Sequence, residues 1–283
     1  MAVIGLYFVL GVAGALYLAP TTVLGLDLET YRRAGEALWA GGDPYAASLG
    51  LGPEMQYRYP PLLAMLMPIV GQPVVWYPLL AAATTATIWV GYRAAGWPGV
   101  LPAVLLIGAW GQQLLNGNAQ GVVVLLLALT PLLGRGGGPA LALATMIKIH
   151  PAVGLLWFIG RRDWHGVGLF ALASAVLLAL QAPWLDDFIR FYQTDAAVDT
   201  IPGMSLSQFG PLIWGAAILA AAVLALWGSR GRFGWLLAVI AQLVVLPRVY
   251  LVNLPLLMAA PLPAVGRAAS ATLSPPARST TPE

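Results

Sequence analysis

Residues 25–64 read GLDLETYRRAGEALWAGGDPYAASLGLGPEMQYRYPPLLA and interrupt a chain that is otherwise strongly apolar. An apolar run at 2–20 leads into this segment, and another begins at residue 60. Five of the eleven acidic residues of the chain lie in it: Asp27, Glu29, Glu36, Asp43 and Glu54. A polar, aromatic-rich loop between two membrane segments is a place where a membrane protein can act on a lipid-borne molecule. We therefore expect the rest of the chain to be arranged around it.

Composition places the chain among membrane proteins. Its 283 residues are 59% hydrophobic and 9% charged, whereas a soluble domain carries about 25% charged residues. We therefore expect an all-α fold, a polytopic membrane helix bundle. The chain has no cysteine, which excludes a disulfide framework and a cysteine metal site. Its small, dispersed net charge of +3 argues against a nucleic-acid partner.

The apolar stretches of the chain predict its helices. They are 2–20, 60–71, 73–92, 98–112, 119–134, 138–148, 150–160, 166–183, 208–228, 233–247 and 249–265. A membrane-crossing helix needs about 20 apolar residues, and several stretches are shorter, so we expect about 10 spans with short re-entrant helices. Residues 1–266 are expected to form one membrane domain, in which 2–20 is a retained first span. The tail 267–283, rich in Ser, Thr, Pro and Ala, is expected to be disordered.

Arginine placement predicts the orientation, because basic residues in short loops stay on the cytoplasmic side. The arginines of the short turns and the tail are Arg93, Arg135, Arg161, Arg162, Arg230, Arg232, Arg267 and Arg278. This rule puts the loops 27–59 and 184–207 outside and the tail inside. It predicts a multi-pass plasma-membrane protein with its site on the extracytoplasmic face. The orientation requires residues 60–92 to cross the membrane an odd number of times, so we expect 60–71 to dip in and return as a re-entrant or interfacial helix while 73–92 crosses.

Residues 28–40 predict a short amphipathic helix that lies in the membrane interface. Leu28, Tyr31 and Leu38 fall on one face of this helix, and its charged residues fall elsewhere. The run Gly41–Pro44 is expected to end the helix.

Asp27 stands at or near the start of that helix and has two compatible interpretations. The first is an N-cap, which stabilises a helix by about 1 kcal/mol. The second is a general base, because a carboxylate beside apolar walls can have its pKa raised toward a useful range.

Lys148 and His150 stand between the short apolar stretches 138–148 and 150–160. We expect these stretches to form a helical hairpin whose tip opens into a polar cavity. An ionisable residue there costs roughly 2.5–3.5 kcal/mol on insertion scales. The two side chains are either a structural pair that binds backbone carbonyls or a binding site for a phosphate or pyrophosphate.

Two arginines are further candidates for binding a phosphate. Arg58 adjoins Tyr59 and is either a snorkelling residue of an interfacial aromatic belt or a phosphate clamp whose aromatic neighbours pack on a sugar or lipid. Arg248 forms, with Tyr250 and Asn253, a polar patch in an apolar region. It is a further candidate for a phosphate contact.

Amide and hydroxyl side chains supply the remaining candidates. Asn116, Asn118 and Gln120 form a polar turn that either caps the next helix or binds sugar hydroxyls. Ser205 precedes a later apolar stretch and is either a cap or part of the site. The sequence contains no metal-ligand cluster, Walker loop, dinucleotide fingerprint or G-x-S-x-G elbow. A nucleotide-driven enzyme or pump is therefore not expected.

The order of these features resembles a known family. The patches are Asp27-Leu28, Tyr31, Ala34-Gly35, Leu38, Gly41-Gly42, Pro44-Tyr45, Tyr59-Pro60-Pro61, Asn116-Gly117-Asn118 with Gln120, Lys148-Ile149-His150-Pro151 and Met204-Ser205-Leu206. From about residue 5 to 260 they are similar to the polyprenol-phosphate-mannose-dependent α-mannosyltransferases, the glycosyltransferase 87 family. The chain departs from the family pattern near residues 247–253, where members often carry Trp and His.

The resemblance implies a GT-C membrane fold and a transferase without metal or other cofactor. The donor would be a sugar, most simply mannose, on a polyprenyl phosphate, and the acceptor a hydroxyl of a glycolipid or polysaccharide. Asp27 matches the family's base in an inverting single displacement. Candidates for the donor phosphate are Lys148, His150, Arg58 and Arg248. Candidates for sugar or acceptor contacts are Tyr31, Tyr45, Tyr59, Asn116, Asn118, Gln120, Ser205, Tyr250 and Asn253.

Two other functions are compatible with the same residues. A lipid or small-solute transporter or flippase would use Lys148 and His150 as its substrate or proton site. A catalytically inactive scaffold homologue is suggested by the altered C-terminal region. The sequence leaves the oligomeric state open, and the partners it predicts are the two lipid substrates and membrane lipids.

Overall fold

The structure is a computed structural model that describes residues 25–48, 56–194, 205–247, 249 and 251–260. The expected first span 2–20 and the tail 267–283 lie outside these residues, as do Arg248 and Tyr250. Helices and turns make up the described ranges, which contain no strand. The expectation of an all-α fold is confirmed for this part of the chain.

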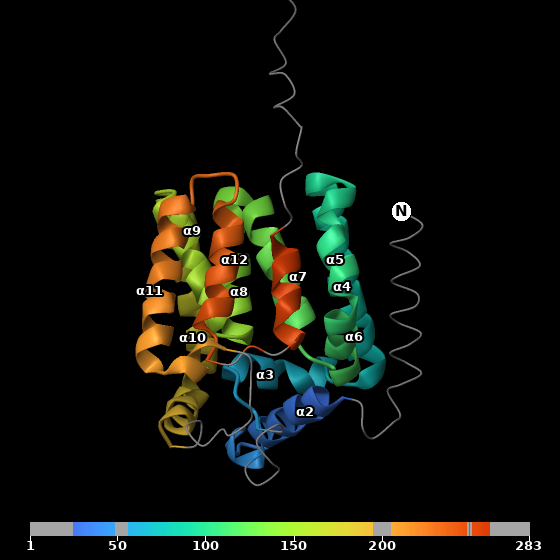
Figure 1. Cartoon of the computed structure of the whole chain (residues 1–283). Helices are drawn as coiled ribbons and strands as arrows, with labels where there is room; N and C mark the ends of the chain where they lie inside the picture. Colours follow the sequence, from blue (N-terminus) through green and yellow to red (C-terminus); the bar gives the residue numbers. More distant parts are fainter. Residues whose placement is uncertain (1–24, 49–55, 195–204, 248, 250, 261–283) are drawn as a thin grey trace, which may run out of the picture.

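The helices form an upright bundle with two helices across one end (Figure 1). The elements are α2 (Leu26–Trp39), η1 (Ala46–Ser48), α3 (Pro61–Val70), α4 (Pro73–Ala95), η3 (Trp97–Gly99), α5 (Leu101–Leu105), α6 (Ile107–Asn116), α7 (Gln120–Leu132), η4 (Gly134–Gly137), α8 (Gly138–Ile147), η5 (His150–Gly154), α9 (Leu155–Gly160), α10 (Trp164–Thr194), η7 (Leu206–Phe209), α11 (Pro211–Gly228), α12 (Gly234–Val245) and η8 (Leu251–Ala259). Helices α2 and α3 lie across the lower end of the bundle in Figure 1.

Three helices of the described chain, α4, α10 and α11, are long and apolar enough to cross a membrane. A fourth span is possible if the pair Trp97–Leu105 and Ile107–Asn116 counts as one. That pair is bent by 62°, so the continuous helix expected at 98–112 is wrong. The bend falls at Leu106, whose φ of −100° and ψ of 16° leave the helical region. The described part of the chain does not confirm about ten spans.

Helix α3 packs along α2 and does not run with the bundle (Figure 1). Gly35 of α2 makes this contact possible, because a Cβ there would lie 2.7 Å from the carbonyl oxygen of Ala64. Helix α4 starts only three residues after α3 ends and turns into the bundle. The arrangement agrees with the interpretation that residues 60–71 do not cross on their own.

The stretch 138–160 forms the expected hairpin. Helix α8 ends at Ile147 because Lys148 adopts extended backbone angles, φ −144° and ψ 135°. Element η5 then packs back on α8, and a Cβ at Gly154 would meet the side chain of Leu141 at 2.8 Å. This reversal puts Lys148 at the turn between the two arms, where its side chain is buried.

Helix α10 is much longer than the sequence predicts. It continues past residue 183 to Thr194, so the segment expected to be a loop from residue 184 begins as helix. Aromatic contacts hold this extension: Phe191 stacks on Tyr45 at 5.3 Å, and the Tyr192 hydroxyl donates to the Arg58 carbonyl at 2.8 Å. Hydropathy could not reveal them because the partners come from a distant loop.

Candidate functional site

One amide side chain connects three segments that are far apart in the sequence. The Nδ2 atom of Asn118 donates to Oδ2 of Asp27 at 2.9 Å, and Nζ of Lys148 donates to Oδ1 of Asn118 at 2.9 Å. The backbone N–H of Gln120 also donates to this Oδ1, at 2.9 Å. An acid on α2 and a cation at the hairpin tip are therefore held on opposite sides of one amide. The bond to the first N–H of α7 agrees with the capping hypothesis for Asn118, while its binding of sugar hydroxyls stays a prediction.

The turn that carries Asn118 is fixed by its neighbours. Gly117 has a left-handed φ of +69°, and a Cβ on it would lie 2.7 Å from the Cβ of Leu28. Glycine is therefore required for both the turn and the close approach of α2. The indole N–H of Trp76 donates to the Gly117 carbonyl at 2.7 Å. These contacts lock the position of α2 against the turn, and so the position of Asp27 beside Asn118.

Asp27 does not cap α2, so that part of the sequence prediction is wrong. Gly25 occupies the N-cap position with a φ of 92°, and its carbonyl accepts a bond from the N–H of Glu29 at 2.8 Å. Asp27 lies one residue inside the helix, where its side chain turns toward Asn118 instead of the helix end. Its carboxylate faces the bundle and still lies near the helix N-terminus, whose partial positive charge stabilises an anion.

The surroundings of Asp27 tune its acidity. Burial raises the pKa of the Asp27 carboxyl above its usual range, while the positive charge of Lys148 and the hydrogen bond from Asn118 partly oppose this rise. In the described chain, Asp27 and Lys148 form no direct ion pair, since the amide of Asn118 stands between them. The carboxylate therefore keeps more proton affinity than a salt-bridged one would have, as a base requires.

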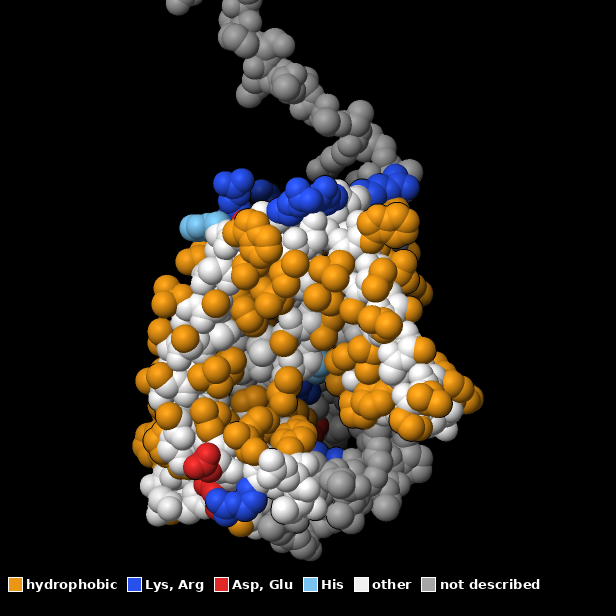
Figure 2. Space-filling model, turned by 90° about the vertical axis from the view of Figure 1, so that its left-hand side faces the viewer, with side chains coloured by type: hydrophobic (Ala, Val, Ile, Leu, Met, Phe, Trp, Pro, Cys, Tyr) orange, Lys and Arg blue, Asp and Glu red, His pale blue; other side chains and the backbone are white. Residues whose placement is uncertain are grey.

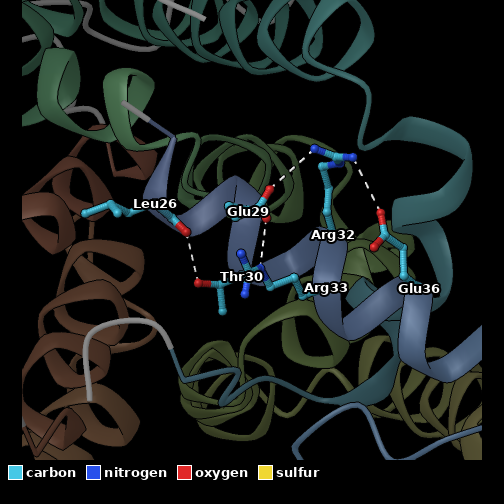
Figure 3. Close-up of polar contacts among 6 residues, drawn as sticks. All are labelled: Leu26, Glu29, Thr30, Arg32, Arg33 and Glu36. Atoms are coloured by element: carbon cyan, nitrogen blue, oxygen red, sulfur yellow. Dashed lines mark hydrogen bonds and ion pairs between the residues drawn. The ribbon is translucent and has the colours of Figure 1, made fainter. Parts of the chain in front are cut away.

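The other acids of α2 are directed elsewhere. Figure 3 shows Glu29 and Glu36 paired with arginines of the same helix. Glu29 binds Arg33 at 2.8 Å and Arg32 at 3.4 Å, and Arg32 also reaches Glu36 at 3.4 Å. The acid of this helix that contacts the bundle is Asp27. The expected division of α2 into a charged face and a packed face is thus confirmed.

Aromatic rings form the wall beside Lys148. The ammonium of Lys148 lies 5.0 Å from the ring centre of Tyr59, and the Tyr31 ring meets Tyr59 edge-on at 5.4 Å. Tyr45 supports this wall from behind: it is buried, and its hydroxyl donates to the Tyr59 carbonyl at 3.0 Å. Tyr59 thus adjoins the cation directly, whereas Tyr31 and Tyr45 contact Tyr59.

The two other predicted phosphate-binding residues that the structure describes, His150 and Arg58, have different neighbours. His150 is buried beside Lys148 and the side chain of Gln242. Arg58, next to Tyr59 in the chain, donates to Oε1 of Gln56 at 3.0 Å. Sequence analysis missed Gln242, although a single amide in the apolar helix GWLLAVIAQLVV was the available signal.

The remaining candidates lie around or outside this cluster. Asn116 is the last residue of α6, and Gln120, fully buried, is the first of α7. Asn253 is buried in η8, which packs on α6 and α7. Ser205 instead bonds to Ser207 and to the Leu246 carbonyl, and it lines a separate apolar groove with residues of η7 and α12.

The surface of the molecule is hollowed on one side. Figure 2 shows a recess low on one side of the molecule, with Lys or Arg, Asp or Glu, and His atoms visible among apolar side chains. Within the described ranges, no group of three His, Cys, Asp or Glu side chains is arranged to hold a metal ion. The reaction without metal that the sequence suggested stays a prediction.

Comparison with known proteins finds distant relatives. The chain is 26% identical over 263 residues to the polyprenol-phosphate-mannose-dependent alpha-(1-2)-phosphatidylinositol mannoside mannosyltransferase of Mycolicibacterium smegmatis, covering 72% of this chain and 58% of the relative. The protein of the same name from Mycobacterium tuberculosis is 28% identical over 226 residues, covering 64% of this chain and 51% of the relative.

A third relative has a similar name. The polyprenol-phosphate-mannose-dependent alpha-(1-2)-phosphatidylinositol pentamannoside mannosyltransferase of Mycolicibacterium smegmatis is 28% identical over 268 residues, covering 79% of this chain and 65% of the relative. The chain thus spans about half to two thirds of the length of these relatives. No family model and no solved structure matches it. The three relatives are distant, and each is named as a polyprenol-phosphate-mannose-dependent mannosyltransferase.

Proposed function

We propose that this protein is a membrane mannosyltransferase that moves mannose from a polyprenyl-phosphate donor to a hydroxyl of a glycolipid of the phosphatidylinositol mannoside class. The observation that carries the proposal is the chain of hydrogen bonds from Asp27 through Asn118 to Lys148. The names of three distant relatives supply the donor and acceptor classes. Figure 2 shows a recess low on the molecule in which acidic and basic side chains are visible.

The reaction is a single displacement with inversion at the anomeric carbon. An oxygen of Asp27 takes the proton of the acceptor hydroxyl while the oxygen of that hydroxyl attacks the anomeric carbon. The bond between this carbon and the phosphate oxygen breaks, and its electron pair leaves with the polyprenyl phosphate. The raised pKa of Asp27 suits proton removal. Holding both lipids beside this acid supplies a further part of the rate.

The leaving phosphate requires positive charge. Lys148 is fixed by Asn118 and by the ring of Tyr59, so its ammonium is positioned before the substrate arrives. Such preorganised charge stabilises the departing anion without reorganisation during the reaction. Arg58, His150 and Arg248 remain proposed helpers at the same phosphate, and Tyr31 and Tyr59 are proposed walls for the sugar.

We place this site on the extracytoplasmic face of the plasma membrane. The turns between α9 and α10 and between α11 and α12 carry Arg161, Arg162, Arg230 and Arg232. They lie at the end of the bundle away from α2 (Figure 1). Because basic turns stay inside, this end is expected to be cytoplasmic and the Asp27 end extracytoplasmic.

A transfer assay tests the proposal. Full-length protein in proteoliposomes is given polyprenyl phosphate carrying radiolabelled mannose, together with phosphatidylinositol mannoside. We expect label to appear in a larger glycolipid, with release of polyprenyl phosphate. Movement of intact donor across the bilayer without a new glycolipid would instead support a flippase. Absence of both activities despite donor binding would support an inactive homologue.

The pH dependence of transfer is expected to report Asp27. A base acts when ionised, so kcat/KM should fall as the pH drops through the raised pKa of Asp27. Asn118→Leu removes a hydrogen bond that lowers this pKa, so its acidic limb should move to higher pH than in the wild type. The measurement is log kcat/KM against pH.

The matched control for this profile is Asn116→Leu, since Asn116 lies in the same turn and is not the residue bonded to Asp27. Its acidic limb should coincide with that of the wild type. Identical limbs for the wild type and Asn118→Leu would contradict the assignment of Asp27 as the titrating group.

A further inference from the structure

We propose that the two basic turns at the other end of the bundle, residues 160–165 and 228–233, together bind the phosphate of an anionic phospholipid. We call this surface the arginine rim; its cations are Arg161, Arg162, Arg230 and Arg232. Figure 2 shows Lys and Arg side chains gathered at this end of the molecule. The inference does not depend on the proposed transfer, because the rim lies at the opposite end from Asp27 (Figure 1).

The two turns form one surface because each holds the other. Nε of Arg230 donates to the Gly160 carbonyl at 3.1 Å, and Nη1 of Arg161 reaches the Ser229 carbonyl at 3.4 Å. Glycine at residue 160 permits this approach, since a Cβ there would overlap the carbonyl oxygen of Leu226. The arginines therefore lie on a joint platform and not on two independent loops.

The arginine rim carries more positive than negative charge, and nearby carboxylates do little to neutralise it. In the described residues, none of its four guanidinium groups has a carboxylate within ion-pair distance. The nearby Asp163 accepts a bond from the backbone N–H of Gly166 at 3.2 Å at the start of α10. By contrast, Arg33 on α2 is paired with Glu29. The unused guanidinium N–H groups are suited to bind phosphate oxygens.

Aromatic side chains surround these cations. Arg161 lies 4.8 Å from the ring centre of Trp157, and Arg232 lies 4.6 Å from that of Phe233. Trp164 and Trp227 are 64% and 84% exposed next to the two turns. Exposed tryptophans are enriched where a protein meets the headgroup layer of a membrane.

The helix sides that continue from the rim favour a lipid over a free anion. Helices α10 and α11 present exposed aliphatic residues along their length, including Leu172, Val176, Leu219 and Val223. A phospholipid whose phosphate binds the rim would lay its acyl chains along these apolar sides. Basic residues near an anionic leaflet contribute attraction of this kind, and a free phosphate lacks the apolar part.

Lipid binding to the purified full chain tests the inference. Detergent-solubilised protein is titrated with phosphatidylglycerol or phosphatidylcholine, and bound lipid is counted by native mass spectrometry. We expect preferential retention of phosphatidylglycerol. The double variant Arg162→Gln/Arg232→Gln, which spares both bonds between the turns, should weaken this binding roughly tenfold or more. The charge-matched control Arg33→Gln/Arg190→Gln removes arginines paired with carboxylates and should retain it.

A second variant separates charge from folding. Arg162 has a left-handed φ of 58°, which glycine adopts more readily. Arg162→Gly should therefore keep or raise the thermal stability and still weaken phosphatidylglycerol binding. Equal binding of both lipids, or unchanged binding by both rim variants, would overturn the inference. Displacement of the lipid by millimolar inorganic phosphate would identify a plain anion site and overturn the lipid assignment.

Discussion

Replacing Asp27 with asparagine is expected to lower the rate of mannose transfer by about 10²–10⁴-fold, the usual contribution of a general base. The asparagine oxygen can still accept the bond from Asn118, so the site geometry should persist while proton removal is lost. Initial rates with radiolabelled polyprenyl-phosphate mannose measure the effect. The loss should fall on kcat more than on KM, since the proton moves during the chemical step.

Stability data separate this effect from misfolding. Burial raises the pKa of Asp27, which means that the folded state disfavours the ionised carboxylate at neutral pH. The neutral isostere removes this cost, so Asp27→Asn should unfold at the same or a higher temperature than the wild type. Glu29→Gln is the matched control, because Glu29 lies on the same helix but is paired with Arg33. A fully active Asp27→Asn protein would disprove the assignment of the base.

Replacing Lys148 with methionine is expected to lower kcat by about 10²–10³-fold, the loss typical of one preorganised electrostatic contact. The ammonium is proposed to stabilise the departing phosphate, and methionine has a similar length without charge. The same change removes a charge that lowers the pKa of Asp27. The acidic limb of the remaining activity should therefore move to higher pH. Both quantities come from one series of transfer rates against pH.

The control for Lys148→Met is Arg190→Gln, which removes a cation that is exposed and paired with Asp187 at 2.8 Å. Its transfer rate should match the wild type. Thermal unfolding of Lys148→Met separates the expected loss of kcat from misfolding, because the change also removes the bond from Nζ to Asn118. A Lys148→Met protein with normal kcat and an unshifted acidic limb would show that the cation acts neither on the phosphate nor on Asp27.

Residue chemistry singled out three candidate residues, Asp27, Asn118 and Lys148, that the structure brings together. Asp27 begins a polar stretch in an apolar chain, and Lys148 is the only lysine, placed between two apolar stretches. Asn118 belongs to a compact amide turn. A polar or charged side chain is unusual in such an apolar chain and costs free energy to bury, so each of these residues was given a functional hypothesis. Their direct connection through one amide could not be predicted, because the bonded residues are 91 and 30 positions apart in the sequence.

Other assignments failed where a distant contact outweighed local pattern. Local sequence favours aspartate as an N-cap, yet Gly25 takes that position while Asp27 turns to Asn118. Hydropathy ended α10 near residue 183, yet Tyr45 and the Arg58 carbonyl supply partners that hold the helix through Tyr192. Gln242 escaped notice because only packing reveals that this amide adjoins His150.

The sequence by itself determined that the chain is helical and membrane-like, and that its scarce polar residues are the ones to examine, because hydrophobicity and its period act within a single segment. The tertiary structure alone decided which of these residues meet. It brought Asp27, Asn118 and Lys148 together and left Ser205 at another groove. The physical reason is that hydrogen bonds and close glycine contacts between segments depend on how the helices pack, which no local pattern encodes.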